Sequence, residues 1–406
     1  MSNMYRRFVK DRSRCVDCGF CSSVIRCPSP ERCIGCEACY LGCPYEAIVP
    51  VDDFEPRRTI KVTIDGEKYE VPEYLTVKTV LEIVGYRFTR FPEKGALFAP
   101  CGTGGCYSCA VLINGELKPS CHTKVEDGMV IETDVSNTTP LRIIEGFTPH
   151  SVGGVGTPYY LKGVGRYIEV ACFAAGCNLR CKTCQNFFVT YDSVSTPLTP
   201  REAALKLTSL RRRYGVDRMA ISGGEPTINR RWLLEFFKEL RKLNRDEKAR
   251  FHLDTNTTIL TRDYIDELME AGITDIGPDL KALNLETFQL ITGIDDKELA
   301  MKYLKTSWEA VKYIADNYYP EKVFMGIGIP YNKFFHPTMD ELFKMGQKIA
   351  EIDPEIQVCV LDYRPEFRRR DIKQPTPQEM LQVKRILEAA GLKTVIVQTT
   401  IGHIGP

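Results

Sequence analysis

The sequence of 406 residues has almost no net charge, no long apolar run and no cysteine after position 359. A formal charge of +1 gives no general attraction to nucleic acid or to an anionic membrane surface, and we expect neither as a partner. No apolar run reaches the roughly eighteen residues that a membrane-spanning helix needs. The basic stretch 1–14 has no apolar segment, so we expect no secretory signal and a cytoplasmic location.

The chain is rich in cysteine, with 17 residues. Most of them fall in C-x2-C pairs, which favour metal centres in a reducing compartment over disulfides. The length favours about two to four domains. The cysteine clusters, the glycines and the hydrophobic periodicity predict four segments, which are residues 1–55, 56–134, 135–165 and 166–406.

The first segment, residues 1–55, carries eight cysteines and few apolar residues. Its second run has the spacing C-x2-C-x2-C-x3-C-P and resembles the bacterial ferredoxins that hold two [4Fe–4S] clusters. The resemblance implies one cluster on Cys15, Cys18, Cys21 and Cys43, and a second on Cys27, Cys33, Cys36 and Cys39. Two structural zinc sites are the alternative. Because little apolar surface is available for a core, we expect the clusters to hold this module together.

The second segment, residues 56–134, combines strand signals with a further cysteine motif. Thr59–Ile64 alternates like a strand, and Asp65-Gly66 is typical of a hairpin turn. Four cysteines follow, three of them in the spacing C-x4-C-x2-C: Cys101, Cys106, Cys109 and Cys121. This pattern resembles the plant-type ferredoxins, and the resemblance implies a β-grasp domain with one [2Fe–2S] cluster. Residues 135–165 are rich in glycine and proline, which predicts a connector that drapes over the next domain and a solvated His150.

Residues 166–406 alternate strand-like and helix-like patterns, which predicts a parallel sheet covered by helices. The candidate strands are 167–173, 217–222, 250–255, 275–280, 323–329, 356–363 and 394–398. Capping boxes that begin at Thr199, Thr338 and Thr376 predict the starts of three helices. Six or seven such units predict an α/β fold, a partial (β/α) barrel, with its chemistry on the loops after the strands.

A loop after the first of these strands carries Cys177, Cys181 and Cys184 in the spacing C-x3-C-x2-C. Three thiolates can hold three irons of a [4Fe–4S] cube and leave the fourth iron open for a ligand that is not protein. A structural zinc site or three buried free cysteines are the alternatives. The spacing resembles the radical S-adenosylmethionine (SAM) superfamily, in which SAM chelates the open iron.

Three motifs after later strands extend this resemblance. Gly223, Gly224 and Glu225 match a family element that presents backbone polar groups and a carboxylate to the SAM amino group. The stretches Leu253-Asp254-Thr255-Asn256 and Asp279-Leu280-Lys281 resemble the activating enzymes of glycyl radical enzymes, such as that of pyruvate formate-lyase. The resemblance implies that Asp254, Thr255 and Asp279 help to hold a monovalent cation beside SAM and that Lys281 faces SAM. A local ion pair is the alternative for Asp279 and Lys281.

The chain departs from the activating enzymes at three positions that the resemblance places near SAM or substrate. Thr183 stands where an aromatic residue is common, Thr257 where glycine is common, and the loop 362–365 lacks a common histidine. These departures bear on the substrate more than on the SAM chemistry. The lack of cysteine after 359 excludes the auxiliary clusters of C-terminally extended radical enzymes, and Cys172 and Cys359 are expected in the core.

Together the motifs predict three [4Fe–4S] clusters, one [2Fe–2S] cluster, SAM and a monovalent cation. The expected function is a radical SAM oxidoreductase that cleaves SAM to a 5′-deoxyadenosyl radical, with the fused ferredoxin modules delivering electrons from an external low-potential donor. The expected substrate is a protein glycine, as in the glycyl-radical activators. A modification or biosynthetic enzyme acting on another protein residue or on a small molecule is one alternative, and a non-catalytic electron-transfer subunit is another.

Overall fold

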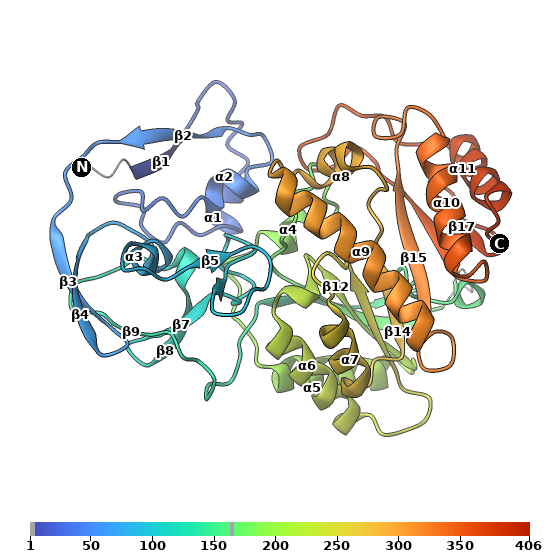
Figure 1. The fold of residues 1–406 in the computed structure, drawn as a ribbon, viewed down its shortest axis with the longest axis horizontal. Helices are drawn as coiled ribbons and strands as arrows, with labels where there is room; N and C mark the ends of the chain where they lie inside the picture. The colour runs from blue at the N-terminus through green and yellow to red at the C-terminus, as the bar shows by residue number, and fades with distance from the viewer. Residues whose placement is uncertain (1–4, 163–165) are drawn as a thin grey trace. The chain divides into compact units, whose positions relative to one another are not determined.

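The computed structural model describes residues 5–162 and 166–406, and the chain divides into two compact units (Figure 1). The first unit comprises residues 1–145, 174–178 and 186–199, and the second comprises 146–173, 179–185 and 200–406. The two ferredoxin-like segments predicted from the sequence both fall in the first unit. The boundaries of the four predicted segments stay a prediction.

The N-terminal part of the first unit is a small module built on one strand pair. Strand β1 (Tyr5–Lys10) pairs antiparallel with β2 (Ile48–Asp53), and two short helices, α1 (Phe20–Ser23) and α2 (Ala38–Gly42), lie between them in the chain. Cys43, Ala47 and Ile48 form one buried apolar cluster of this module. Phe20, Ile25, Ile34 and Ala38 of the same module are also buried.

A five-stranded sheet with the order β4-β3-β9-β7-β8 follows. Its strands are β3 (Thr59–Ile64), β4 (Glu67–Pro72), β7 (Ala110–Ile113), β8 (Glu116–Pro119) and β9 (Val130–Glu132). The predicted turn at Asp65-Gly66 is confirmed, with φ angles of 48° and 88°, because a two-residue hairpin with the twist of the strands needs two positive φ angles.

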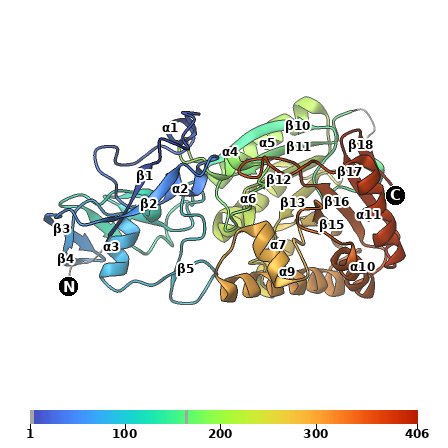
Figure 2. The same cartoon turned by 90° about the horizontal axis from the view of Figure 1, so that it is seen from above.

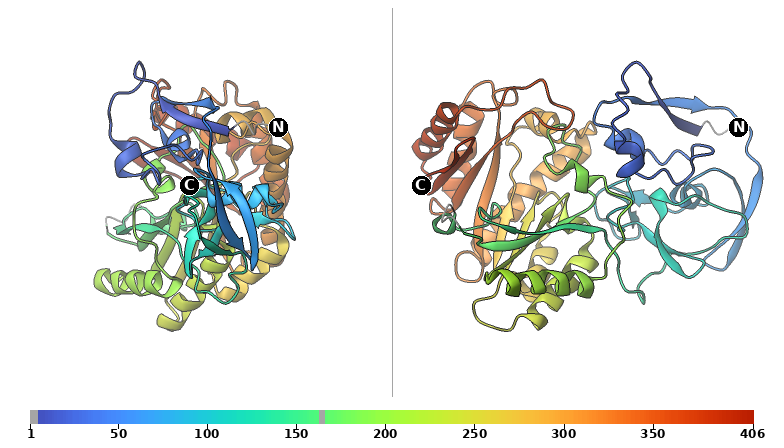
Figure 3. Two further views of the ribbon diagram at one scale, coloured as in Figure 1. Left: turned by 90° about the vertical axis from the view of Figure 1, so that its left-hand side faces the viewer. Right: turned by 180° about the vertical axis from the view of Figure 1, so that it is seen from behind.

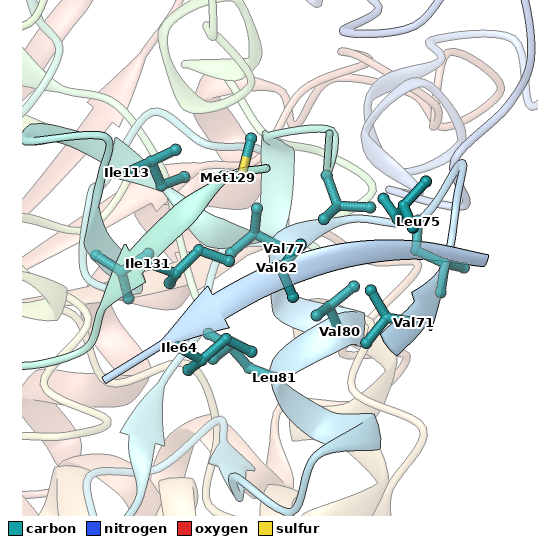
Figure 4. Close-up of a cluster of buried hydrophobic side chains, with 13 residues drawn as sticks. Val62, Ile64, Val71, Leu75, Val77, Val80, Leu81, Ile113, Met129 and Ile131 are labelled. Carbon is teal, nitrogen blue, oxygen red and sulfur yellow. The ribbon is translucent and has the colours of Figure 1, made fainter. Parts of the chain in front are cut away.

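One helix, α3 (Val77–Ile83), covers this sheet. Thr76 caps its N-terminus by accepting a hydrogen bond from Thr79 N. Figure 4 shows Val80 and Leu81 of the helix beside Val62 and Ile64 of β3, all of them buried. The alternation in β3 and the helical spacing in α3 therefore supply the two faces of one core. Two shorter strands, β5 (Phe88–Thr89) and β6 (Leu97–Phe98), follow α3 in the chain and pair with each other.

The second unit is built on a nine-stranded sheet whose strand order follows the chain order from β10 to β18. Strands β12 to β17 are parallel, and β18 is antiparallel to β17. The strands are β10 (Ile144–His150), β11 (Glu169–Ala174), β12 (Arg218–Gly223), β13 (Arg250–Thr255), β14 (Asp275–Pro278), β15 (Phe324–Tyr331), β16 (Gln357–Asp362), β17 (Val395–Thr399) and β18 (Gly402–Ile404). All seven predicted strands are confirmed.

Helices connect the parallel strands and pack on the outer side of the sheet (Figure 2). They are α5 (Pro200–Tyr214), α6 (Arg230–Leu243), α7 (Arg262–Ala271), α8 (Leu285–Thr292), α9 (Lys297–Asn317), α10 (Asp340–Ile352) and α11 (Pro377–Ala389). The fully buried stripe of Trp232, Phe236 and Leu240 fastens α6 to the sheet. The result is the predicted partial (β/α) barrel.

Two sequence predictions are corrected. The glycine-rich connector was expected to be a linker, but Ile144–His150 forms strand β10 and joins the sheet beside β11, as the view from behind in Figure 3 shows. The last part of that connector, residues 163–165, lies outside the described residues. The capping box predicted at Thr376 is confirmed. The one predicted at Thr338 is wrong, because α10 begins at Asp340 with Met339 as its N-cap.

The carboxylate predicted to complete the capping box at Thr338 has another role. Glu341 accepts hydrogen bonds from Leu283 N and Asn284 N, at 2.9 and 2.8 Å, and so satisfies backbone donors at the start of α8. Within residues 5–162 and 166–406, no helix is both long and apolar enough to cross a membrane.

Candidate functional site

The predicted SAM residues of the second unit gather at one edge of its parallel sheet. Thr255 is the last residue of β13, and Asp279 and Lys281 follow β14 directly. In the parallel register Thr255 pairs with Pro278, so the ends of β13 and β14 lie side by side. The carboxyl edge of such a sheet is where βα loops build active sites, and the sequence prediction for this edge rests on the same rule.

Glu225 is almost fully buried and its carboxylate is engaged by its neighbours. Oε1 accepts hydrogen bonds from the hydroxyls of Thr227 and Thr255, both at 2.7 Å, and Oε2 accepts one from Asn256 N at 2.6 Å. Burial raises the pKa of Glu225, and these hydrogen bonds oppose the shift. Glu225 therefore joins the loop after β12 to the end of β13, a role that the sequence did not predict.

Asp254 contacts a residue of its own strand. His252 Nε2 lies 3.0 Å from Asp254 Oδ1, and its Nδ1 lies 3.3 Å from Glu169 Oε2. Burial alone would lower the pKa of His252, but the two flanking carboxylates raise it to about 9. The imidazole is therefore a cation held between two acids, and it fixes the orientation of the Asp254 carboxylate.

Glu169 links this histidine to further charged residues. Arg218 Nε lies 3.7 Å from Glu169 Oε2, and Arg218 Nη1 donates to Asp275 Oδ1 at 2.8 Å. The histidine expected to be solvated, His150, is only 30% exposed and places Nδ1 3.5 Å from Glu169 Oε1. Asp275, Arg218, Glu169, His252 and Asp254 therefore form a row of alternating negative and positive charges along the strands.

Asp279, Lys281 and Tyr363 form a second group. Lys281 Nζ donates to Asp279 Oδ2 at 2.8 Å and to Tyr363 Oη at 3.0 Å. Burial would lower the pKa of Lys281, but the Asp279 carboxylate raises it well above its ordinary value, so the side chain is an ammonium. The ion pair that was the alternative reading of Asp279 and Lys281 is therefore present.

Cys181 belongs to the same group. Burial raises the pKa of its thiol to about 12, and the Lys281 ammonium acts in the opposite direction. A thiolate is the form that binds iron, and a neighbouring cation favours the thiolate. The loop of Cys181 is held from within its own unit, since Arg368 N and Arg369 N donate to Lys182 O at 3.0 and 3.1 Å.

Glycines bring backbone close to both aspartates. A Cβ atom on Gly154 would lie 2.0 Å from Asp254 Oδ2, and one on Gly328 would lie 2.2 Å from Asp279 Oδ1. Gly154 belongs to the connector, which here lies against the sheet as expected of a draping segment. Only glycine allows so close an approach at these two positions.

Thr257, which stands where the activating enzymes commonly have glycine, has an unusual backbone conformation. Its φ of 57° lies in the left-handed region that favours glycine, and a β-branched residue rarely adopts it. Asn256 Oδ1 supports the turn by accepting hydrogen bonds from Thr258 N at 3.1 Å and Thr258 Oγ1 at 2.7 Å. The backbone conformation is therefore the one a glycine would adopt, although the residue is threonine.

These residues fit a bound cluster and SAM. Cys181 lies near the buried ammonium of Lys281. Asp279 Oδ1 is buried and has no hydrogen-bond partner among the described residues. Such an oxygen is available to a ligand group or a cation. Within residues 5–162 and 166–406, no three histidine, cysteine or acidic side chains are grouped for a single metal ion, so the monovalent cation stays a prediction.

In the first unit the eight N-terminal cysteines separate into two groups. Cys15, Cys18, Cys21 and Cys43 line a cavity of about 300 Å³. Burial raises the pKa of the Cys36 thiol to about 12, and the neighbouring Cys39, Cys27 and Cys33 raise it further. These are the two sets that the ferredoxin resemblance implies, and their assignment as cluster ligands stays a prediction.

The other predicted iron ligands of the first unit are the four [2Fe–2S] cysteines and Cys177. Cys101, Cys106, Cys109 and Cys121 are all buried, and the Sγ atoms of Cys101 and Cys106 lie 3.1 Å apart. Thr103 N donates to Cys101 Sγ at 3.4 Å, a contact typical of cluster-binding loops. Cys177 is partly exposed, while Cys172 and Cys359 are buried core residues as expected.

Sequence reasoning missed Glu169 and His252. One signal was available, because His252 and Asp254 are two residues apart in a strand and so share a face of the sheet. Glu169, likewise, is an acidic residue in an otherwise apolar strand. The resemblance placed the loop 362–365 near SAM or substrate, but the contact of Tyr363 with Lys281, 82 residues away in the chain, was not predicted.

Two known protein families match separate parts of the chain. The radical SAM superfamily matches residues 172–342, and the 2Fe-2S iron-sulfur cluster binding domain matches residues 57–136. The chain therefore contains a radical SAM domain and a 2Fe–2S ferredoxin-like domain. The first implies a [4Fe–4S] cluster and SAM, and the second implies a [2Fe–2S] cluster.

Individual relatives cover parts of the chain. An uncharacterized iron-sulfur protein of Methanocaldococcus jannaschii is 48% identical over 82 residues, which are 18% of this chain and only 16% of that protein. A protein of Saccharolobus islandicus named "Probable GTP 3′,8-cyclase" is 25% identical over 214 residues, 47% of this chain and 67% of its own. The solved structure of Streptococcus suis SuiB bound to precursor peptide SuiA aligns with a TM-score of 0.42 at 15% identity, over 56% of this chain and 48% of that chain.

Proposed function

We propose that the protein is a radical SAM enzyme that takes its electrons from its own ferredoxin modules. A bound [4Fe–4S] cluster and SAM would supply the reductive cleavage to methionine and a 5′-deoxyadenosyl radical. The observation that carries the proposal is the group of Cys181, Asp279, Lys281 and Tyr363 at the carboxyl edge of the sheet. Lys281 offers a fixed positive charge beside the cysteine, and Asp279 offers a free carboxylate oxygen.

The test is formation of 5′-deoxyadenosine by the anaerobically purified full chain with dithionite and SAM. We expect the wild type to form it and Cys181→Ala to form none, because two cysteines cannot hold the site-differentiated cluster. Cys359→Ala is the matched control, since Cys359 is a buried core cysteine. Absence of 5′-deoxyadenosine from a wild-type sample with full iron content would favour the electron-transfer subunit instead.

For the substrate, we propose a protein glycine, as in the activators of glycyl radical enzymes. The support is the pair of motifs 253–256 and 279–281, which the sheet places at adjacent strand ends. The deciding measurement is electron paramagnetic resonance on the enzyme mixed with SAM and a co-purified partner. A persistent doublet on the partner supports the proposal, whereas many deoxyadenosines per partner without a lasting radical contradict it.

A nucleotide substrate is the second candidate. It is favoured by the relatives named as GTP 3′,8-cyclases, one of which aligns over 214 residues. Incubation with GTP, SAM and dithionite, followed by chromatography and mass analysis, tests it. Conversion of GTP into a cyclised nucleotide in proportion to 5′-deoxyadenosine would support this candidate, and unchanged GTP would exclude it.

A further inference from the structure

Gly176, which precedes Cys177, lies against the [2Fe–2S] loop of the same unit. A Cβ atom at position 176 would lie 2.6 Å from Cys106 Cβ and 3.2 Å from Cys101 Cβ. No side chain fits into so short a gap, so the two cysteine loops are in backbone contact. The φ of Gly176 is 81°, which also favours glycine.

A second glycine makes the same contact from the other loop. A Cβ atom on Gly105 would lie 2.8 Å from Ala175 Cβ and 2.3 Å from Asp192 O. Ile143 lies between the loops, because Ile143 N donates to Gly105 O at 3.1 Å and Ala175 N donates to Ile143 O at 3.0 Å. Three backbone segments therefore form one hydrogen-bonded layer at this point.

Two arginines hold the Cys177 loop in place. Arg142 is fully buried and donates from Nη2 to Ala175 O at 2.9 Å. Arg90 Nη2 donates to Asn178 O at 3.0 Å. The two carbonyl groups flank Cys177 on either side, and hydrogen bonds from charged donors are stronger than neutral ones. Hydrogen bonds from two arginines therefore stabilise the position of the Cys177 loop against the [2Fe–2S] loop.

On its other side the [2Fe–2S] domain meets the N-terminal module. The ring of His122, the residue after Cys121, places Nε2 2.9 Å from Arg26 O, and Arg26 precedes Cys27. Lys124 and Glu31 form an ion pair nearby. Residues at or adjacent to [2Fe–2S] cysteines therefore contact a residue adjacent to Cys27 of the N-terminal module and a residue adjacent to Cys177.

From these contacts we infer that the [2Fe–2S] domain stands in the middle of a linear electron path and is the direct donor to the cluster of the Cys177 motif. The inference rests on the proposed function. One electron from an external low-potential one-electron donor would enter the N-terminal module and pass by way of Arg26 and His122. It would then cross from Cys106 to the loop of Gly176, oxidising the [2Fe–2S] cluster and reducing the next cluster by one electron each.

A competing path leads directly from the N-terminal module. Phe20, beside Cys21, packs on Phe187 and Phe188 with ring centroids 5.5 and 5.4 Å away, and these residues follow Cys184 closely in the chain. This contact is between side chains, whereas the contact of Gly176 with Cys106 is between the backbones of cluster loops. At its Cys177 end the linear path therefore runs through the residue bonded directly to a cluster cysteine, whereas Phe187 is three residues away from Cys184.

The test is Gly176→Ala in the full chain, with Gly115→Ala as its matched control. Both glycines have nearly the same φ, 81° and 82°, but a Cβ atom at Gly115 meets nothing within 4 Å. Both variants therefore place an alanine at the same positive φ, and only Gly176→Ala adds a contact with Cys106 and Cys101. Phe20→Leu interrupts the competing aromatic path, because it removes both ring contacts.

The readout is freeze-quench electron paramagnetic resonance after mixing with reduced methyl viologen. The signal of the Cys177-motif cluster is identified by its change on adding SAM and by its absence in Cys181→Ala. We expect Gly176→Ala to slow reduction of this cluster several-fold and to weaken its magnetic broadening of the [2Fe–2S] signal. Gly115→Ala and Phe20→Leu should leave both unchanged.

Slower reduction in Phe20→Leu with no change in Gly176→Ala would overturn the linear path. Where Gly176→Ala loses iron, Arg90→Gln replaces it as the variant, because it weakens the hold on Asn178 O without adding a clash. Dithionite-driven 5′-deoxyadenosine formation is measured in the same samples. If it is absent from the wild type, the proposed function fails, whereas unchanged reduction rates in all variants contradict only the electron path.

Discussion

Lys281 donates a hydrogen bond to the hydroxyl of Tyr363 at 3.0 Å, and the two residues follow different parallel strands, β14 and β16. Tyr363 N in turn donates to Tyr331 O at 2.9 Å, which fixes the tyrosine backbone to the end of β15. The ammonium is thereby held between a carboxylate on its own loop and a phenol from a distant one. Its position beside Cys181 depends on both.

Replacing Tyr363 by phenylalanine removes one of the two acceptors of this buried ammonium. A hydrogen bond to a charged group contributes about 1.5 kcal/mol or more, so we expect 5′-deoxyadenosine formation to fall roughly tenfold. Iron content should stay unchanged, because no cysteine is altered. Tyr331→Phe is the control, since Tyr331 is also buried and lies at the neighbouring strand end. Equal activities of the two variants would contradict a role for the Tyr363 hydroxyl.

Lys281 should also tune the reduction potential of the adjacent cluster. A positive charge near a cluster favours the added electron, so Lys281→Met should make the potential of the Cys177-motif cluster more negative. Loss of about 1.2 kcal/mol of charge interaction corresponds to roughly 50 mV for one electron. A redox titration followed by electron paramagnetic resonance measures the shift. Lys281→Arg keeps the charge and should largely preserve the potential.

His252 is expected to hold the interior of the second unit together. Its replacement by glutamine leaves the buried Glu169 and the partly buried Asp254 without the cation between them. Breaking a buried ionic group costs about 3 kcal/mol or more, so thermal unfolding of the radical SAM part should occur at a lower temperature. His403→Gln is the control, because His403 lies in the edge strand β18 and is only partly buried. Equal unfolding temperatures would show that the charges rearrange.

The parts of this structure that follow local rules could be predicted. Strand periodicity placed all seven candidate strands, and turn chemistry placed Asp65-Gly66. The prediction that the site would lie at strand ends followed from parallel topology alone, because the carboxyl ends of such strands share an edge. These features depend on residues a few positions apart, where sequence patterns carry most of their information.

The parts that depend on distant residues could not be predicted. The hydrogen bonds of Glu225 come from Thr255 and Asn256, about one βα unit further along the chain, and they give this residue an organising role. Strand β10 was hidden in a segment whose glycines indicated a linker, because its strand character comes from pairing at the sheet edge. The need for glycine at position 176 could not be predicted either, because it comes from contact with Cys106 and Cys101 of a distant loop.

The cross-ligation of the N-terminal module gives the last prediction. If Cys43 shares a cluster with Cys15, Cys18 and Cys21, then Cys43→Ser and Cys18→Ser should disturb the same electron paramagnetic resonance signal, and Cys36→Ser should disturb the other. The full chain should bind about 14 irons, and each variant should lose up to about four. The cavity lined by these four cysteines is the structural reason. If Cys43→Ser and Cys36→Ser altered one common signal instead, the cluster ligands would follow the order of the chain and the cross-ligation would be wrong.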